Sequence, residues 1–265
     1  MIALEEIPYA MLFRPFVILY HAVSDTWDDV LSLHVRDVEA QLKRLVDRGF
    51  RGCTAEELLR RPTDGRLVHV TFDDGYASIA NALPILRSLG IPSTIFVCTD
   101  FAQGGQPLLI PELAAIAQVD ELKTIDWAQL REFAADGLVE IGSHTRSHAH
   151  LPGLSDDELT REIRDAKQAI EDNLGLRCPS FAYPYGEHDQ RVRDAVRAAG
   201  HTLGFAASRV PYPFDPYQIP RTGFWRGGAA KRNNLKTRLP VRLLRGTGWI
   251  GRPRFASGRT DNRRP

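Results

Sequence analysis

The sequence predicts an α/β fold in which a mostly parallel sheet is wrapped by helices. Short apolar segments alternate with amphipathic ones from residue 16 to about residue 223. The apolar segments are nearly continuous, as expected for strands that are buried on both faces. Because strands and helices follow each other in turn, the strands are expected to lie parallel. An N-terminal extension at 1–15 and a basic tail at 224–265 fall outside this pattern.

Individual elements follow from hydrophobic spacing and from the glycines that end the helices. The predicted strands are 16–20, 67–72, 93–97, 138–142, 179–183 and 202–207. The predicted helices are 38–48, 80–89, 127–136, 156–174 and 189–199. Pro84 is expected in the first turn of the second helix or at a kink within it. Functional side chains gather at the carboxyl ends of strands in barrels of this kind, so the polar residues that follow these strands should meet at one face.

Length and composition are those of a globular domain that needs no disulfide or structural metal in order to fold. The chain has 265 residues, 43% hydrophobic and 25% charged, enough for one large core. Cys53, Cys98 and Cys178 are far apart and form no CxxC pair, so we expect small buried side chains rather than disulfides. Any bound metal is therefore expected to be catalytic rather than structural.

The net charge of +1 conceals a strong asymmetry. Residues 221–265 contain thirteen Lys and Arg against one acid, Asp261, which leaves 21 basic and 32 acidic residues in the rest of the chain. Leu, Trp and Ile side chains lie among these basic residues, so contact with an anionic membrane surface is one interpretation and a solvated tail is the other. Basic residues alone do not specify nucleic acid, and we expect no nucleic-acid partner.

The N-terminal segment does not resemble a secretory signal. It carries Glu5 and Glu6, lacks a basic start, and has Arg14 and Pro15 within its apolar run. No stretch approaches the ~20 apolar residues that span a bilayer. The sequence predicts a cytoplasmic protein, with peripheral contact at the inner membrane face if the tail binds lipid.

The first motif with chemical content is TFDDGY, residues 71–76. Asp73 and Asp74 follow an apolar strand directly, and adjacent carboxylates at such a place are unfavourable unless positive charge lies beside them. Gly75 allows the chain to turn so that both can face a pocket. The alternative is that Asp74 caps the helix that follows.

The second motif is HTRSH, residues 144–148, which follows another predicted strand. His144 and His148 at i and i+4 would lie on one face of a helical turn, an arrangement that suits two imidazoles on one metal ion. The pair is a weak signal alone, as His150 nearby shows. Combined with an aspartate from another strand end it gives three ligands and an open position, which is typical of catalytic zinc.

The third motif is FAYPYGEH, residues 181–188. Its aromatic-Pro-aromatic-Gly turn would present a backbone N–H to a developing oxyanion and form a sugar-binding wall. The alternative is a buried aromatic turn.

Together the three motifs resemble the polysaccharide deacetylases of carbohydrate esterase family 4, over about residues 16–223. The resemblance implies a distorted (β/α) barrel, one divalent metal, and removal of acetyl groups, chiefly N-acetyl, from a polysaccharide or glycan precursor. Zinc is the expected metal, although two imidazoles and a carboxylate also accept Co²⁺, Ni²⁺, Mn²⁺ and Fe²⁺. The alternative is a catalytically inactive carbohydrate-binding protein with the same fold.

The resemblance also assigns roles to individual residues. Asp73 corresponds to the catalytic base, and Asp74, His144 and His148 correspond to the metal ligands. Tyr185 corresponds to the residue whose amide holds the oxyanion. Tyr183 and Pro184 belong to the same substrate-facing turn.

Two departures from the family pattern require substitutes. The family's arginine beside the base falls on Ala182; Arg221 in the segment QIPRT is our preferred replacement, ahead of Arg177. The family's C-terminal Leu-x-His strand, which supplies the general acid, is missing. LYHAV, residues 19–23, resembles the opening of a branch that includes bacterial poly-N-acetylglucosamine deacetylases, in which the motif order is permuted, so His21 is the predicted acid. The alternative is that His21 only ends a strand.

The remaining candidates carry less chemistry. Asp126 and Trp127 resemble a segment of the same branch, but we expect a helix cap and a core anchor. The other histidines fall into two groups: His34, His69 and His201 are expected to be structural, while His150 and His188 lie near the motifs and are candidates to line the pocket.

Overall fold

A parallel sheet forms the centre of the molecule in the computed structural model, which describes residues 15–59, 66–108, 119–207 and 215–226. Within these residues nine strands form one sheet in the order β10-β9-β8-β7-β6-β5-β1-β11, with β4 paired to β5. The strands are β1 (Phe16–Tyr20), β4 (Arg51–Gly52), β5 (Leu67–Phe72), β6 (Ser93–Val97), β7 (Val139–Ser143), β8 (Ser180–Ala182), β9 (Leu203–Ala206), β10 (Ile219–Pro220) and β11 (Thr222–Gly223). Every pairing among them is parallel, as the sequence predicts. Two short strands, β2 (Ala22–Val23) and β3 (Ser32–Leu33), form a separate pair.

The sheet curves into a nearly closed barrel whose two edges meet at one short segment. β10 pairs with β9 at one end of the strand order, and β11 pairs with β1 at the other. Only Arg221 separates β10 from β11. The chain therefore joins both edges of the sheet within five residues, and the predicted distorted (β/α) barrel is confirmed.

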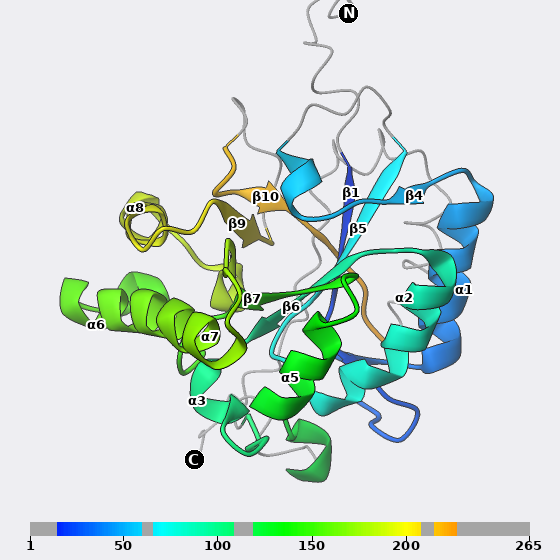
Figure 1. Ribbon diagram of the computed structural model, residues 1–265, viewed down its shortest axis with the longest axis horizontal. Helices are drawn as coiled ribbons and strands as arrows, with labels where there is room; N and C mark the ends of the chain where they lie inside the picture. Colours follow the sequence, from blue (N-terminus) through cyan, green and yellow to red (C-terminus); the bar gives the residue numbers. More distant parts are fainter. Residues whose placement is uncertain (1–14, 60–65, 109–118, 208–214, 227–265) are drawn as a thin grey trace, which may run out of the picture.

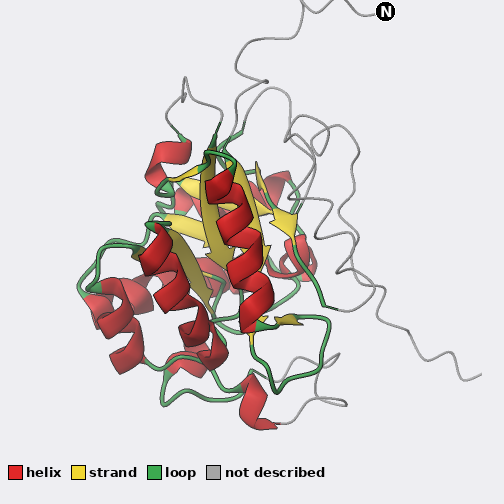
Figure 2. Cartoon of the chain, turned by 90° about the vertical axis from the view of Figure 1, so that its right-hand side faces the viewer, coloured by secondary structure: helices red, strands yellow, loops and turns green. Residues whose placement is uncertain are grey.

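Helices cover the outside of the barrel (Figures 1 and 2). They are α1 (Val35–Asp47), α2 (Leu83–Leu89), α3 (Thr99–Ala102), α5 (Trp127–Ala134), α6 (Asp156–Thr160), α7 (Ala166–Leu174) and α8 (Gln190–Ala198). A π-helical segment, Arg161–Asp165, joins α6 to α7, so the predicted helix at 156–174 is continuous but locally widened. Pro84 lies in the first turn of α2, after a 3₁₀ helix at Ala77–Ala82. Its ring therefore interrupts no hydrogen bond of the helix interior.

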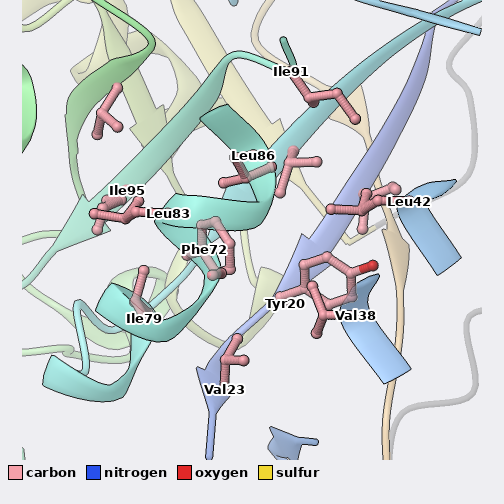
Figure 3. Close-up of a cluster of buried hydrophobic side chains, with 14 of the residues drawn as sticks. Tyr20, Val23, Val38, Leu42, Phe72, Ile79, Leu83, Leu86, Ile91 and Ile95 are labelled. Atoms are coloured by element: carbon pink, nitrogen blue, oxygen red, sulfur yellow. The ribbon is translucent and has the colours of Figure 1, made fainter. Parts of the chain in front are cut away.

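The core has an outer and an inner layer because successive strand residues point to opposite faces. Tyr20 and Phe72 point outward against Leu42 of α1 and Leu86 of α2 (Figure 3). The opposite face is inside the barrel, where Phe96 packs against Phe205 with ring centroids 5.2 Å apart. All ten side chains of the apolar cluster that contains these two rings are buried, so the barrel interior is filled rather than open.

The chain remains packed against the barrel for a few residues beyond β11. The predicted domain ends at Gly223, and the next residue, Phe224, is fully buried against Phe16 and Tyr20. Arg226 hydrogen-bonds to the carbonyl oxygens of Ser24 and of Ser32 in β3. The packed chain thus continues to residue 226.

The predicted membrane contact of the tail concerns residues that lie outside the described part of the chain, and so do most residues of the N-terminal extension. Within the described residues, no helix is both long and apolar enough to cross a membrane.

All three cysteines are free and buried, which confirms their expected role as small core side chains.

Candidate active site

The polar residues of the motifs follow the carboxyl ends of neighbouring strands. His21 follows β1, Asp73 and Asp74 follow β5, and His144 follows β7. β1 pairs with β5 in register, so Tyr20 lies beside Phe72 and brings His21 next to the aspartate pair. The expectation that these residues meet at one face is confirmed.

Asp74, His144 and His148 form a compact buried cluster. Their ligand atoms lie within 4.8 Å of one another. Asp74 Oδ1 is 3.5 Å from His144 Nε2 and 3.3 Å from His148 Nε2, and all three side chains are at most 5% exposed. Burial would raise the pKa of Asp74, but the two imidazoles hold it well below its ordinary value. The carboxylate is therefore charged and available as a ligand.

The donor atoms of this cluster fit a divalent cation. Asp74 Oδ1 is buried without a hydrogen-bond donor of acceptable geometry, which is unusual for a carboxylate oxygen. His144 Nδ1 lies 2.8 Å from the carbonyl oxygen of Ala182, so Nδ1 carries the proton and the lone pair of Nε2 faces Asp74. Two imidazole nitrogens and one carboxylate oxygen are three protein ligands, the number typical of catalytic zinc, whose fourth position is taken by water or substrate.

The backbone around Asp74 explains how it reaches the cluster. Asp74 has φ 70° and Gly75 has φ 65°, two successive left-handed residues that reverse the chain after β5. A Cβ on Gly75 would lie 3.0 Å from Val97 Cγ1, so a larger residue would crowd β6. The following 3₁₀ helix begins after Tyr76 and has no side-chain cap. The alternative interpretation of Asp74 as a helix cap is therefore wrong.

The histidine pair does not lie on a helical turn, and this part of the prediction is wrong. Residues 144–148 form an irregular loop in which Thr145 has φ 72° and His148 has φ 64°. The loop carbonyls of Thr145 and Arg146 accept hydrogen bonds from the amides of Thr99 and Asp100. Because these loop carbonyls accept hydrogen bonds from α3 and not from the loop's own amides, no helical turn forms. The irregular conformation of the loop brings the two imidazoles together instead.

Asp73 is held by a buried arginine. Arg221 Nη1 and Nη2 donate to Asp73 Oδ1 and Oδ2 at 2.6 and 2.8 Å, and Nη1 also donates to Thr71 Oγ1 at 3.2 Å. The guanidinium lies 5.6 Å from the centre of the Phe96 ring. Burial would raise the pKa of Asp73, but Arg221 and His144 lower it below the ordinary value. Asp73 is thus an ionised carboxylate with a fixed orientation, next to the metal-ligand candidates.

The structure shows which of the two candidate arginines, Arg221 or Arg177, contacts Asp73. Ala182 ends β8 and packs inside the barrel, so no guanidinium comes from that place. Arg177 is exposed on the surface before β8. Arg221, on the segment that closes the barrel, supplies the contact instead, as preferred from the sequence.

His21 lies beside the aspartate pair and against an aromatic ring that the sequence analysis missed. Trp225 lies with its ring centroid 5.0 Å from that of His21. Burial lowers the pKa of His21, while the charges of Asp74 and Asp73 oppose this effect. Trp225 falls in the predicted tail because the sequence becomes rich in Arg, Gly and Pro and poor in acids after Gly223. Nothing in the local sequence indicates that its ring lies on His21.

Trp225 is held in place by its neighbour. Arg226 donates through Nε to the Ser32 carbonyl at 2.8 Å and through Nη2 to the Ser24 carbonyl at 2.6 Å. Its backbone N–H donates to the carbonyl of Val30 at 3.1 Å. These bonds fasten the chain after β11 to β3 and to the loop that precedes it.

The turn after β8 separates its three candidate residues. Tyr183 and Pro184 are buried, and the Tyr183 hydroxyl donates to the carbonyl of Tyr217 at 2.9 Å. Tyr185 has φ 57°, and its ring lies 4.6 Å from that of His148 and stacks on His150 at 3.8 Å. Of the three residues, only Tyr185 contacts the cluster, through the His148 ring. The buried side chains of Tyr183 and Pro184 support the turn.

The remaining histidines divide largely as expected. His69 is buried between the Cys53 carbonyl and Thr94 Oγ1, and His201 bonds to the Cys178 carbonyl, so both are structural. His188 packs on Tyr183, with ring centroids 4.6 Å apart. Asp126 caps α5 through a capping box with Gln129, and Trp127 packs on the core.

Comparisons with known proteins point to one family. The family model described as "Polysaccharide deacetylase" matches residues 60–204. The Bacillus subtilis protein YxkH, named for a polysaccharide deacetylase, is 26% identical over 195 residues, which is 71% of this chain and 62% of YxkH. The chain thus spans less than two thirds of that relative's length. Poly-beta-1,6-N-acetyl-D-glucosamine N-deacetylase of Staphylococcus aureus is 26% identical over 205 residues, covering 72% of this chain and 67% of its own.

A solved structure shares the fold over most of both chains. IcaB from Ammonifex degensii superposes with a TM-score of 0.69 and 25% identity, covering 86% of this chain and 98% of that one.

Proposed function

Because the chain belongs to the polysaccharide deacetylase family, we propose that it is a metal-dependent hydrolase that removes N-acetyl groups from a sugar polymer or glycan precursor and releases acetate. One observation carries the proposal: the carboxylate of Asp73, ionised and fixed by Arg221, lies directly beside the buried cluster of Asp74, His144 and His148. A glycan-binding protein has no need of a buried base next to three converging ligand atoms. A base beside a metal site is one established arrangement for amide hydrolysis, because the base can activate a water molecule next to the cation.

Asp74, His144 and His148 would hold the divalent cation, with Zn²⁺ as the first choice. When bound, such a cation polarises the acetyl carbonyl and makes a neighbouring water molecule more acidic. The Nδ1 contact of His144 with the Ala182 carbonyl keeps its ring oriented for this purpose.

Asp73 is the base of the proposed reaction. Its carboxylate takes the proton of the attacking water, while Arg221 keeps both oxygens in one orientation. Arg221 also stabilises the charged form, so Asp73 is deprotonated before each turnover. Orientation of a base by a bidentate partner restricts the attack to one direction.

Tyr185 and His21 act on the two ends of the amide in this proposal. The backbone N–H of Tyr185 donates to the oxyanion of the tetrahedral adduct in this scheme. His21 supplies a proton to the departing amino group, and the neighbouring carboxylates oppose the effect of burial on its pKa. Trp225 limits the positions that the His21 ring can take.

The substrate class is inferred from the relatives. The Staphylococcus aureus relative is named for poly-beta-1,6-N-acetyl-D-glucosamine, so we propose a β-1,6-linked N-acetylglucosamine polymer as the first glycan to test. Oligomers of the β-1,4-linked isomer serve as the comparison because they carry the same acetamido group on a different backbone.

The test is acetate release by the purified protein from both oligomers, after chelation and again after Zn²⁺ or Co²⁺ is restored. Release that depends on metal supports the proposal, and the ratio between the two oligomers reports linkage preference. Absence of release with metal bound, on all acetylated sugars tried, would favour the inactive carbohydrate-binding alternative.

Asp73→Asn is the matched variant for this test. The amide cannot accept the proton from water, so kcat should fall by at least the ~10²–10⁴-fold typical of a lost general base. Metal content should remain that of the unaltered protein because the three ligands are intact. Undiminished turnover of Asp73→Asn would refute the assignment of the base.

A further inference from the structure

The loop that carries both histidines, residues 144–148, has a conformation that it cannot maintain by itself. Thr145 and His148 both have positive φ, which is unfavourable for residues with a side chain, and such conformations persist only where the surroundings fix them. The loop has two sets of backbone groups to satisfy. Its carbonyls at Thr145 and Arg146 bond to the amides of Thr99 and Asp100, at 3.2 and 3.0 Å.

Two amides of the loop, those of Arg146 and Ser147, are satisfied by one carboxylate, that of Glu162. Its Oε2 accepts from the N–H groups of Arg146 and Ser147, both at 3.0 Å. Its Oε1 accepts from the hydroxyl of Ser147 at 2.9 Å. Three hydrogen bonds from two successive residues are enough to fix the loop's position relative to the helix that carries Glu162.

The place of Glu162 in its helix is also unusual. It belongs to the π-helical segment Arg161–Asp165 between α6 and α7. Such single-turn widenings are uncommon and occur frequently at functional sites. The flanking residue Ile163 is fully buried, so the segment is anchored to the core while Glu162 faces the loop.

We propose that Glu162 is a positioning residue for the metal site, which holds the loop at 144–148 so that His144 and His148 converge on Asp74. This inference rests on the proposed function, since it assumes that the cluster binds a metal. Glu162 touches neither the cluster nor the place of the reacting atoms; it acts through the amides of Arg146 and Ser147. The N–H of His148 donates to Thr145 Oγ1 at 3.0 Å, so the position of the loop also determines the position of the His148 imidazole.

Three substitutions of Glu162 distinguish the effect of its hydrogen bonds from the effect of its negative charge. Glu162→Gln keeps the reach and loses the charge: its carbonyl oxygen can still accept both N–H bonds, and its amide can donate to Ser147 Oγ. Glu162→Asp keeps the charge but is one methylene shorter, so it cannot maintain all three bonds. Glu162→Ala removes both. Asp172→Ala, which removes an exposed carboxylate of α7 bonded to Gln168, is the matched control.

The measurement is Co²⁺ affinity of the full chain after chelation, followed through the visible absorption of the bound ion, whose shape and intensity report the ligand geometry. We expect Glu162→Ala and Glu162→Asp to bind Co²⁺ about 10–100-fold more weakly, as for other partners that orient ligands, with an altered spectrum. Glu162→Gln and Asp172→Ala should bind like the unaltered protein. Circular dichroism checks that each variant is folded; if Glu162→Ala is not, the Gln and Asp variants still decide.

Two results would overturn the inference. One is unaltered affinity and spectrum in Glu162→Asp and Glu162→Ala. The other is an effect that follows charge, with Asp like the unaltered protein and Gln like Ala, because long-range attraction would then replace the contact. Metal binding without acetate release from any acetylated sugar would refute only the proposed function, whereas an unaltered protein that binds no Co²⁺ would refute both.

Discussion

Single residues at the site are constrained by burial as much as by chemistry. Arg221 and Asp73 have side chains that are 1% and 6% exposed, so each charge depends on the other for compensation. Removing one partner of a buried pair costs about 3–5 kcal/mol because the remaining charge has no counterpart. The pair therefore links the stability of the barrel to the orientation of the proposed base.

This link predicts a measurable coupling. Arg221→Ala should lower the free energy of unfolding by about 3–5 kcal/mol, measured by urea denaturation. In an Asp73→Asn background the same replacement should cost much less, since a neutral amide needs no cation. Equal losses in both backgrounds would mean that Arg221 stabilises the barrel through packing on Phe96 rather than through Asp73.

His69 shows how a buried histidine outside the site makes stability depend on pH. Burial lowers its pKa to about 4, against an ordinary value of 6.5. Between these values the unfolded chain binds a proton that the folded chain does not, so stability is present at pH 7 and is lost as the pH falls below about 6.5.

The expected size of the effect follows from the two pKa values. From pH 7 to pH 5, His69 should account for a loss of about 2 kcal/mol in the free energy of unfolding. His69→Asn should therefore unfold with a smaller difference between these two pH values than the unaltered protein. An identical difference in both proteins would assign the pH dependence to other groups.

At the scale of elements, the segment after β11 has a larger role than its length suggests. Phe224 fills the outer core, Trp225 lies on His21, and Arg226 fastens both to β3. These three residues connect the closure of the barrel to the position of the proposed acid.

Two truncations test this role. A chain that ends at Gly223 loses the buried ring of Phe224 and should be less stable than one that ends at Arg226 by at least about 3–5 kcal/mol, the loss typical of replacing a buried Phe by Ala. Both lack residues 227–265, so the comparison isolates the three residues. Equal unfolding midpoints in urea would place the end of the domain at Gly223, as the sequence alone predicts.

At the scale of the whole molecule, the sequence predicts the barrel well where strands are long and buried. The bounds at 16–20, 67–72 and 93–97 agree with the structure because a continuous apolar run between polar turns has few other conformations in a parallel sheet. The motif residues at the strand ends come together for the same reason: the sheet dictates where its carboxyl ends lie.

The parts that sequence could not predict depend on tertiary contacts. β10 and β11 have two residues each and no apolar run, so the closure of the barrel gives almost no local signal. The loop at 144–148 departs from a helix because Thr99, Asp100 and Glu162 satisfy its backbone groups from other elements. The role of Trp225 depends on a packed segment that lies beyond the last recognisable strand.

The position of Arg221 near the end of the described residues also affects the order of events during synthesis. Asp73 leaves the ribosome long before Arg221, and until that residue emerges neither the last strand pair nor the partner of the buried carboxylate exists. A nascent chain that ends before residue 221 would have an open sheet edge beside β1 and an uncompensated acid at its centre. The proposed site and the closed barrel should thus form in a single late step, and incomplete chains are expected to be more sensitive to proteolysis.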